Sequence, residues 1–309
     1  MKVVIVGCGY VGLELSRQLA ERDHDVTGVR RSDAGREAIE AVGSAVDNGE
    51  IEAVSADATD PESLVSLPDA DAVVFAASSG GRGADAAREV YVDGLRCVIE
   101  EYGSRETPPE RLVYTSSTGV YGDHGGGWVD EETPISPTTD KTRVLAEAER
   151  VAIEEANELG IDGTVARFAG LYGPERYRLD RYLNGPVTEG YLNMIHRDDA
   201  AGVVRYLLET GRARNESVLV VDDEPVDKHN FADWLADECG VTRPEKRSKA
   251  ERIADGDLSM AAERRIRTSK RCSNDRLRAL GYECAYPTFR EGYRDAVASF
   301  RAENADFTG

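Results

Sequence analysis

The chain has 309 residues and a formal net charge of −20 at pH 7, with 58 acidic side chains against 38 lysines and arginines. A chain of this length can form one α/β domain with a cap or two modest domains. The excess of acidic residues argues against a nucleic-acid-binding protein, because phosphate contacts need clustered lysine and arginine. No stretch approaches the ~18 unbroken apolar residues of a membrane span, and no secretory signal pattern opens the sequence. We therefore expect a cytoplasmic protein without membrane or nucleic-acid partners.

The first predicted elements are a strand, a glycine turn and a helix. Lys2–Gly7 is a short β-branched run, and the turn reads GCGYVG from Gly7 to Gly12. Apolar residues then recur at helical spacing from Leu13 to Ala20. This G-x-G-x-x-G order predicts a dinucleotide site with the pyrophosphate at the helix N-terminus. A glycine turn with only a structural role is the alternative. The expected cofactor contacts are Gly7, Gly9, Tyr10, Val11 and Gly12.

The second predicted strand, His24–Val29, ends in Arg30-Arg31-Ser32. A site that prefers NAD usually places an acidic residue here for the ribose 2′-hydroxyl. Two arginines and a serine suit the 2′-phosphate of NADP instead, through charge-assisted hydrogen bonds. Asp33 is close enough to keep NAD as an alternative, and a solvated loop is another. We expect NADP as the cofactor, contacted by Arg30, Arg31 and Ser32.

Three later segments are similar to motifs of one known family. Val54–Leu64 reads VSADATDPESL, Ala72–Ala77 reads AVVFAA, and Leu112–Gly122 reads LVYTSSTGVYG. Together with the glycine turn, these segments resemble the extended short-chain dehydrogenase/reductase (SDR) family. The resemblance implies a Rossmann fold and an NAD(P)-dependent activity.

The resemblance also implies roles for individual residues. Asp57 would lie beside the adenine, and Ser117 would polarise a carbonyl or hydroxyl group of the substrate. The alternative for Ser117 is a turn serine that bonds the local backbone. Further residues of the cofactor site would be Ala58, Ala76 and Ala77.

The next predicted helix lacks the family's catalytic pair. Apolar residues at helical spacing from Val144 to Leu159 predict this helix, and Gly160 ends it. Extended SDRs read Tyr-x-x-x-Lys-x-x-x-Glu here. Alignment on Arg143 and the glutamate four residues later places Thr139 at the tyrosine and Arg143 at the lysine.

This replacement changes the expected chemistry. Arg143 keeps the positive charge and could hold ribose hydroxyls of the cofactor. Thr139 cannot serve as the usual general acid or base, since an aliphatic hydroxyl does not titrate near neutral pH. Lys141 is two residues away and is expected to face elsewhere. Other sources of the acid are a tyrosine from another element or a loop histidine, the candidates being Tyr91, Tyr121, Tyr172 and His124.

Segments of the C-terminal half extend the resemblance. Thr164–Gly173, TVARFAGLYG, is followed by Pro174, and Met194–Ala200 reads MIHRDDA. With Leu280-Gly281-Tyr282, these segments fit best the atypical extended SDRs, which carry G-x-G-x-x-G and lack the usual tyrosine.

The stretch after Pro174 contains the candidate substrate-binding residues. Arginines alternate there with tyrosines, and the stretch is short for an extended SDR. Family analogy puts substrate phosphates near this stretch, so Arg176 and Arg178 could clamp an anion. An exposed polar loop is the alternative. The short stretch also implies a substrate smaller than a full nucleotide sugar.

Cysteine occurs at five scattered positions without C-x-x-C spacing or a neighbouring histidine cluster, namely Cys8, Cys97, Cys239, Cys272 and Cys284. This distribution favours reduced or buried thiols over a disulfide framework or a zinc site. We expect no bound metal.

These observations predict an α/β fold, a doubly wound parallel Rossmann sheet with a small C-terminal cap. The Rossmann domain is expected over 1–168, rejoined by about 194–222, and the cap over 169–193 and 223–309. The expected function is that of an epimerase/dehydratase-like or reductase-like SDR, acting as a monomer or homodimer on a sugar-like, carbonyl or phosphorylated small molecule. The alternative is a non-catalytic sensor that binds NADP(H).

The charge pattern suggests adaptation to salt. Arginine supplies nearly all of the positive charge, since lysine occurs at only six positions. Acid-rich, lysine-poor surfaces resemble those of proteins from salt-loaded cytoplasm, where salt screens the repulsion between carboxylates. An ordinary acidic protein is the alternative.

We predict that the melting temperature rises from low salt to multimolar KCl, because screening relieves the repulsion among crowded carboxylates. Thermal unfolding followed by circular dichroism across a KCl series measures this. A melting temperature that stays flat or falls contradicts the halophilic interpretation.

Overall fold

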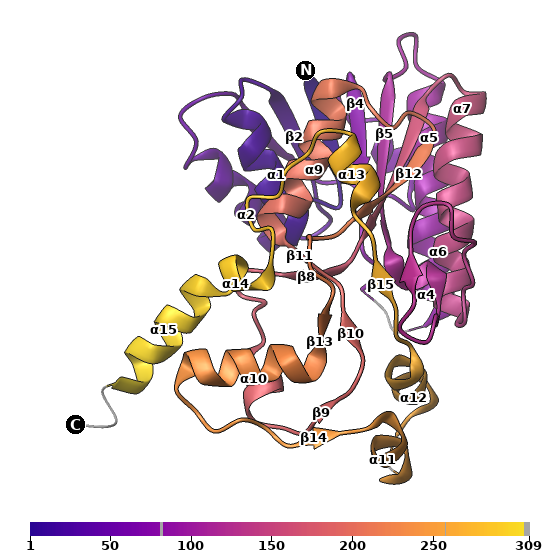
Figure 1. The fold of residues 1–309 in the computed structure, drawn as a ribbon. Coiled ribbons are helices and arrows are strands. Elements are labelled where there is room, and N and C mark those ends of the chain that lie inside the picture. The colour runs from indigo at the N-terminus through magenta and orange to yellow at the C-terminus, as the bar shows by residue number, and fades with distance from the viewer. Residues whose placement is uncertain (81–82, 257, 306–309) are drawn as a thin grey trace.

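The computed structural model describes residues 1–80, 83–256 and 258–305 (Figure 1). Its central seven-stranded sheet has the order β12-β7-β5-β4-β1-β2-β3, and every neighbouring pair is parallel. The doubly wound α/β fold predicted from the sequence is confirmed. The strands are β1 (Lys2–Val6), β2 (Asp25–Val29), β3 (Ile51–Val54), β4 (Ala72–Phe75), β5 (Arg111–Ser117), β7 (Asp162–Phe168) and β12 (Glu216–Val220).

Helices cover both faces of this sheet, because alternate strand residues point to opposite sides. In β1, Val3 and Ile5 belong to one buried core, and Val4 and Val6 belong to the other. The first core is covered by α1 (Tyr10–Ala20), α2 (Asp33–Gly43) and α9 (Arg197–Thr210). The second is covered by α3 (Pro61–Leu64), α5 (Leu95–Gly103) and α6 (Asp140–Arg150).

Two helices of the second face contain π-helical segments. The helix that begins as α4 (Ala84–Arg88) continues through η1 (Glu89–Gly94) into α5. Similarly, α6 continues through η3 (Val151–Glu155) into α7 (Ala156–Glu158). Such wide turns are rare and frequently occur at functional sites. The segment η1 carries Tyr91, which lies in the site described below.

The smaller part of the molecule lies below the central sheet in Figure 1 and has its own aromatic core. Tyr172 stacks on Tyr293 with ring centroids 4.9 Å apart, and Phe231 packs edge-on against Phe289 and Tyr293. Its helices are α8 (Leu179–Leu183), α10 (Lys228–Cys239), α11 (Lys249–Ala254), α12 (Met260–Arg267), α14 (Phe289–Gly292) and α15 (Arg294–Ala305).

Short strands form two-stranded pairs outside the central sheet. The pairs are β8 (Gly170–Tyr172) with β11 (Met194–His196), β9 (Val187–Thr188) with β14 (Lys246–Arg247), β10 (Tyr191–Leu192) with β13 (Val226–Asp227), and β6 (Trp128–Val129) with β15 (Arg271–Cys272). Two further short helices are η2 (Thr118–Tyr121) and α13 (Asp275–Ala279).

The chain crosses between the two parts more than once. After the excursion into the smaller part, α9 packs on α1, and β12 pairs with β7 in the central sheet. The predicted boundaries near 168, 194 and 222 remain predictions. Over residues 1–80, 83–256 and 258–305, the structure contains no helix of the length and apolar character that a membrane crossing requires.

A buried ion pair joins α6 to the end of the sheet. The Arg167 guanidinium in β7 donates to both carboxylate oxygens of Glu149 in α6, the shortest contact being 2.8 Å. Glu149 also accepts a hydrogen bond from Ser116 Oγ at 2.6 Å, and Arg167 Nη1 donates to Tyr121 Oη at 2.6 Å. Elements β5, η2, α6 and β7 are therefore held together where the strands end.

Candidate functional site

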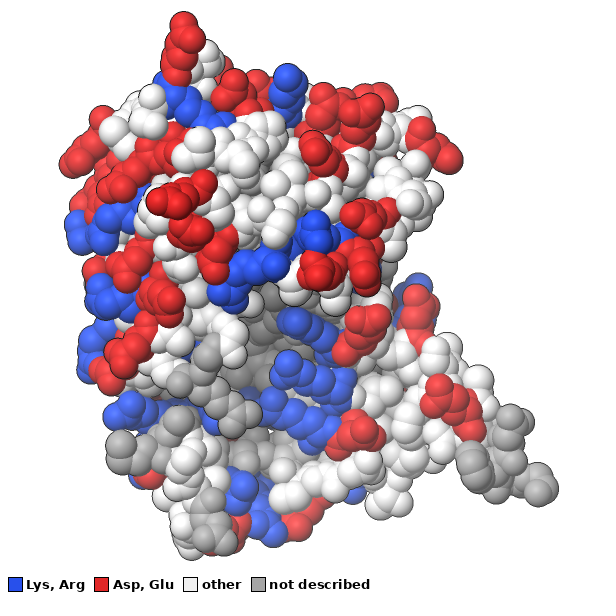
Figure 2. All heavy atoms as spheres, turned by 180° about the vertical axis from the view of Figure 1, so that it is seen from behind, with Lys and Arg blue, Asp and Glu red and all other residues white. Residues whose placement is uncertain are grey.

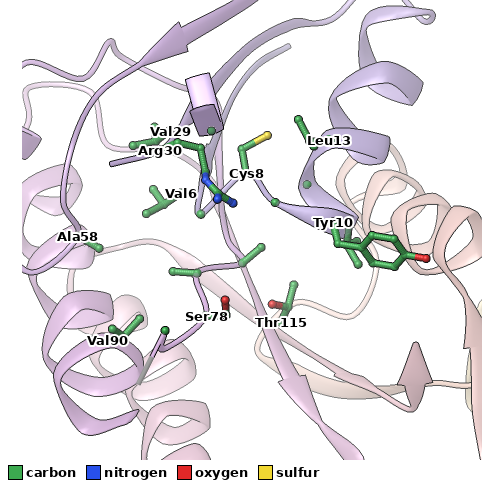
Figure 3. A pocket seen from close by; sticks show the side chains of 18 of the residues that line it. Val6, Cys8, Tyr10, Leu13, Val29, Arg30, Ala58, Ser78, Val90 and Thr115 are labelled. Carbon is green, nitrogen blue, oxygen red and sulfur yellow. The ribbon is translucent and has the colours of Figure 1, made fainter. Parts of the chain in front are cut away.

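A cleft of about 1060 Å³ runs along the carboxyl ends of β1, β2, β4, β5 and β7. In Figure 3, Val6, Val29, Ser78 and Thr115 surround this space from four strands or the loops that follow them. The cleft brings together the residues predicted to bind the cofactor, with the exception of Arg143. Their role in binding remains a prediction. They are Gly7, Gly9, Tyr10, Val11, Gly12, Arg30, Arg31, Ser32, Asp57, Ala58, Ala76 and Ala77.

The glycine turn leaves its backbone open to the cleft. At Gly7 the φ angle is +82°, and an added Cβ would lie 2.2 Å from Ala77 Cα, so a larger residue does not fit. At Gly9 an added Cβ would meet Arg30 Nη1 at 2.7 Å and otherwise only the Gly7 carbonyl at 3.7 Å. Helix α1 begins at Tyr10, and the first N–H groups of a helix lack intrahelical partners. This geometry suits a bound anion.

Arg30 lies across the glycine turn. Added Cβ atoms at Gly9 and Gly35 would each lie 2.7 Å from its guanidinium nitrogens. Figure 3 shows this side chain reaching into the cleft near Cys8. In the part of the chain that the structure describes, Arg30 forms no ion pair with a carboxylate. Its charge is therefore available to a ligand.

Arg31 is paired, in contrast to Arg30. Its Nη1 lies 3.1 Å from Asp57 Oδ2. Partial burial alone would raise the pKa of Asp57, but hydrogen bonds from the Thr59 N–H and hydroxyl and from Arg31 hold that pKa below its usual value. Ser32 accepts a hydrogen bond from the Gly35 N–H at 3.2 Å and caps α2.

The other end of the cleft carries hydroxyl groups and a lysine. Ser117, the last residue of β5, lines the cleft, and its Oγ accepts a hydrogen bond from the Gly119 N–H at 3.1 Å. Ser117 therefore bonds the local backbone, as the alternative interpretation expected, and also lines the cleft. Tyr91 lines the same cleft, and the Lys141 ammonium lies 5.7 Å from the centre of the Tyr91 ring.

The expectation that Lys141 faces elsewhere is wrong. Helix α6 begins directly after Thr139, whose Oγ1 accepts a hydrogen bond from the Thr142 N–H at 3.0 Å. Positions 141 and 145 are four residues apart and share a face, and Lys141 and Leu145 both line the cleft.

The structure does not bring Thr139 or Arg143 into the cleft. The Thr139 hydroxyl is engaged in the helix cap, and the exposed Arg143 guanidinium pairs with Asp140. Neither residue is part of the cleft wall. The geometry therefore gives no support to catalytic roles for Thr139 and Arg143, which the alignment with the family's Tyr and Lys positions had made candidates, or to a cofactor contact from Arg143.

Of the alternative acids, Tyr91 alone among the described residues reaches the cleft wall. Tyr121 is buried and bonded to Arg167, and Tyr172 lies in the core of the smaller part. His124 Nε2 lies 3.0 Å from the Tyr121 carbonyl oxygen, outside the cleft wall. Within the described residues, no group of three or more His, Cys, Asp or Glu side chains is placed to hold a metal ion.

The two predicted substrate arginines differ in position. Arg176 lines the cleft, and its guanidinium lies 3.9 Å from the centre of the Tyr10 ring. Arg178 has a left-handed backbone conformation with φ of +53°, precedes α8, and is not part of the wall. Sequence reasoning also missed wall residues on the strand ends and the following loop, which carry no local signal of exposure to a ligand: Phe168, Ala169, Leu171 and Glu175.

Comparison with known proteins assigns the chain to a family. The model of the NAD dependent epimerase/dehydratase family matches residues 3–223. The chain belongs to this family. The resemblance to extended SDRs inferred from the motifs is therefore confirmed.

Relatives of the family cover nearly the whole chain. The Escherichia coli (strain K12) protein YeeZ is 29% identical over 289 residues, which is 93% of this chain and 96% of YeeZ. A protein from Methylobacillus flagellatus, whose structure is described as an NAD-dependent epimerase/dehydratase, is 29% identical with a TM-score of 0.73 over 97% of this chain and 98% of its own. Human SDR39U1 (isoform 2), solved with NADPH, shares the fold at 17% identity, with a TM-score of 0.75 over 96% of this chain and 99% of its own.

The glycine geometry generates a test of the anion site. We predict that Gly9→Ala keeps the fold but weakens dinucleotide binding at least tenfold, because the new methyl group would meet only a movable arginine side chain and would occupy the approach to the backbone. Gly7→Ala is expected to destabilise the fold itself, because its methyl group would collide with the Ala77 backbone. Thermal unfolding and calorimetric titration with NADP and NAD separate the two effects. Unchanged dinucleotide affinity in folded Gly9→Ala contradicts the assignment.

Proposed function

We propose that the chain is an NADP(H)-dependent oxidoreductase of the epimerase/dehydratase family, acting on a carbonyl or hydroxyl group of a small, anionic, sugar-like substrate. The observation that carries this proposal is that one cleft combines two kinds of residue. It contains an open glycine turn with an arginine that has no carboxylate partner among the described residues, and it also contains Ser117, Tyr91 and Lys141. A volume of about 1060 Å³ is at the upper end of the range for small-molecule sites, which suits a dinucleotide together with a small substrate.

The residues of the turn fit the proposed cofactor. The missing Cβ at Gly9 and the free N–H groups at the start of α1 would receive the pyrophosphate. Asp57 and the neighbouring alanines would line the adenine side of the cleft. When bound, the dinucleotide supplies or accepts a hydride. The protein's own part would be to hold it and to polarise the reacting oxygen through Ser117.

NADP is favoured over NAD by the charge at the end of β2. Arg30 has no carboxylate partner among the described residues, and a 2′-phosphate would supply one. Arg31 pairs with Asp57, an acidic residue of the cleft wall that could otherwise accept a hydrogen bond from a ribose hydroxyl, and Asp33 is paired with Arg36. Ser32 offers a third polar group beside the two arginines.

We predict that NADP binds at least tenfold more tightly than NAD, and that Arg30→Ala removes most of this difference. The reason is the loss of charge-assisted hydrogen bonds to the 2′-phosphate. Calorimetric titration with both dinucleotides measures the effect. Arg150→Ala, an exposed arginine paired with Glu154 on the outer face of α6, serves as the matched control. Equal affinity of the wild-type protein for NADP and NAD contradicts the preference.

The proposal that the substrate is anionic rests on cations on the side of the cleft next to the cap. These cations have no carboxylate partners among the described residues. Figure 2 shows Lys and Arg side chains gathered in the hollow between the two parts of the molecule, whereas the outer surface carries abundant acidic groups. Arg176 lines the cleft. The chain has 58 acidic residues, so most cations can find a carboxylate partner. A cation in the cleft without such a partner therefore indicates a binding site for an anionic ligand.

A second group of cations surrounds Gly190. An added Cβ there would lie 3.3 Å from Lys228 Nζ and 3.8 Å from Lys249 Cε. Burial lowers the pKa of Lys228, and the nearby Arg181 and Lys249 lower it further. None of these three cations forms an ion pair within the described residues. These residues lie outside the cleft wall, and a bound phosphate group would relieve the repulsion among them.

The proposal is tested by turnover and by substitution at Ser117. We expect NADPH oxidation, followed by absorbance, with at least one member of a panel of aldehydes, ketones and nucleotide sugars. Ser117→Ala should lower the rate by about two orders of magnitude, equivalent to ~3 kcal/mol of barrier, because one hydrogen-bond donor to the reacting oxygen is lost.

Thr139→Ala is the contrasting variant. It should cost about 1 kcal/mol of stability through loss of the helix cap and leave the rate per folded molecule within a factor of two. Loss of turnover in Thr139→Ala with retention in Ser117→Ala contradicts both assignments. Tight cofactor binding without turnover on any compound favours the non-catalytic sensor.

A further inference from the structure

A hydride transfer to a carbonyl requires a proton donor, and few ionisable side chains of the cleft wall remain available for this task. Burial raises the pKa of the Cys8 thiol to about 11, and that thiol contacts Ser16 Oγ. The Tyr10 hydroxyl donates to the Pro174 carbonyl at 2.9 Å, and Figure 3 shows its ring pointing away from the centre of the cleft. Asp57 is engaged with Thr59 and Arg31 at the far end.

Three candidates are left, namely Tyr91, Lys141 and Glu175. Glu175 is exposed on the loop after β8, where its backbone has a φ of +65°. Tyr91 and Lys141, by contrast, face each other across the cleft wall from two different helices. The chemistry of these two side chains is complementary, since a phenol can give up a proton and an ammonium group can stabilise the phenolate that results.

The phenol oxygen of Tyr91 is held in place by hydrogen-bond donors. The Ser79 N–H donates to it at 3.2 Å, and Ser79 Oγ lies at 3.3 Å. Both contacts are made with the phenol as acceptor, so its own proton is left for another partner. Donors aimed at an oxygen also stabilise the negative charge that forms there when the proton leaves. The contacts come from the loop after β4, whose residues Ser78 and Gly80 line the same cleft as Ser117.

The Lys141 cation is free to support that charge. Its ammonium lies 5.7 Å from the Tyr91 ring centre, within the range of a cation–π contact. The adjacent Asp140 carboxylate is taken by Arg143, and in the described part of the chain Lys141 has no carboxylate partner. The carboxylate next to Lys141 in the sequence is therefore engaged with Arg143 and does not neutralise Lys141.

We infer that Tyr91 is the catalytic acid and base of the cleft and that Lys141 is its supporting cation, a phenol and amine brought together from η1 and α6. This inference rests on the proposed function and names the group that completes it. In the reducing direction, a C–H bond forms at the substrate carbon with the hydride that the nicotinamide dinucleotide supplies. The carbonyl π electrons move to oxygen, which takes the proton from Tyr91. The phenolate then regains a proton from solvent.

Tyr91→Phe and Lys141→Met test the pair on any panel compound that the wild-type protein turns over. Tyr91→Phe should lower kcat at least a hundredfold, within the range known for loss of a general acid, while NADP affinity changes less than twofold. Lys141→Met should lower kcat about tenfold and, because carbonyl reduction needs the protonated phenol, move the falling limb of the pH profile upward by about one pH unit. Lys141→Arg should restore most of the rate.

Two control variants make the same chemical changes at a tyrosine and a lysine outside the cleft. Tyr206→Phe removes a phenol that donates to the Leu280 carbonyl, and Lys246→Met removes a lysine paired with Asp233. Neither should change kcat. Glu175→Gln tests the other candidate acid. If Glu175→Gln loses turnover while Tyr91→Phe retains it, the Glu175 carboxylate is the acid and the inference is overturned.

A readout that needs no substrate accompanies the kinetics. Tyrosine labelled with ¹³C on the ring reports the titration of Tyr91, assigned by its loss in Tyr91→Phe. Its midpoint should rise in Lys141→Met, and an unchanged midpoint overturns the pairing. Wild-type turnover that survives in Tyr91→Phe overturns the inference and leaves the proposed function intact. Absence of wild-type turnover across the panel removes the catalytic role together with the proposed function.

Discussion

Glu149 and Arg167 form the buried ion pair on which the geometry of the hydroxyl end depends. Removing one partner from such a pair typically costs ~3–5 kcal/mol, because a buried charge is left without compensation. Here the pair also holds Ser116, the neighbour of Ser117, and the hydroxyl of Tyr121 in η2. The same contacts therefore hold α6 against the carboxyl ends of β5 and β7. The position of Lys141 on α6 follows from them.

The distribution of charge divides the molecule into an outside and a cleft. On the outside, arginines are commonly matched with carboxylates one helical turn away, as in Arg150 with Glu154 and Arg267 with Glu263. Such exposed pairs contribute little stability each, but they neutralise part of an excess of acid. Arg30, Lys141 and Arg176 lack such carboxylates within the described residues. The cleft thus carries cations without carboxylate partners, whereas the surface around it carries an excess of acidic groups.

The sequence predicted what is decided locally and missed what depends on packing. The strand, turn and helix of Lys2–Ala20 could be recognised because the three glycines of the turn stand where an added Cβ would approach neighbouring atoms closely. The face of α6 that lines the cleft could not be predicted, because it depends on where the helix begins and on how the Glu149–Arg167 pair packs the helix against the sheet. A shift of two residues separated the expected pair, Thr139 and Arg143, from the residues that line the wall, Lys141 and Leu145. Tyr91 was one candidate among several, since no pattern in the sequence marks a π-helical turn.

The wide turn of η1 places Tyr91 in the cleft by adding one residue to a helix that otherwise runs as α4 and α5. Each residue of an α-helix advances the side chains by about 100°, so an α-helical version of the same segment would need one residue fewer and would point the phenol along a different direction. In evolutionary terms, the insertion or deletion of a single codon would switch this phenol into or out of the cleft while both flanking helices keep their own buried faces. A family that has lost a tyrosine on one helix could acquire one on another by that route, without rebuilding its core.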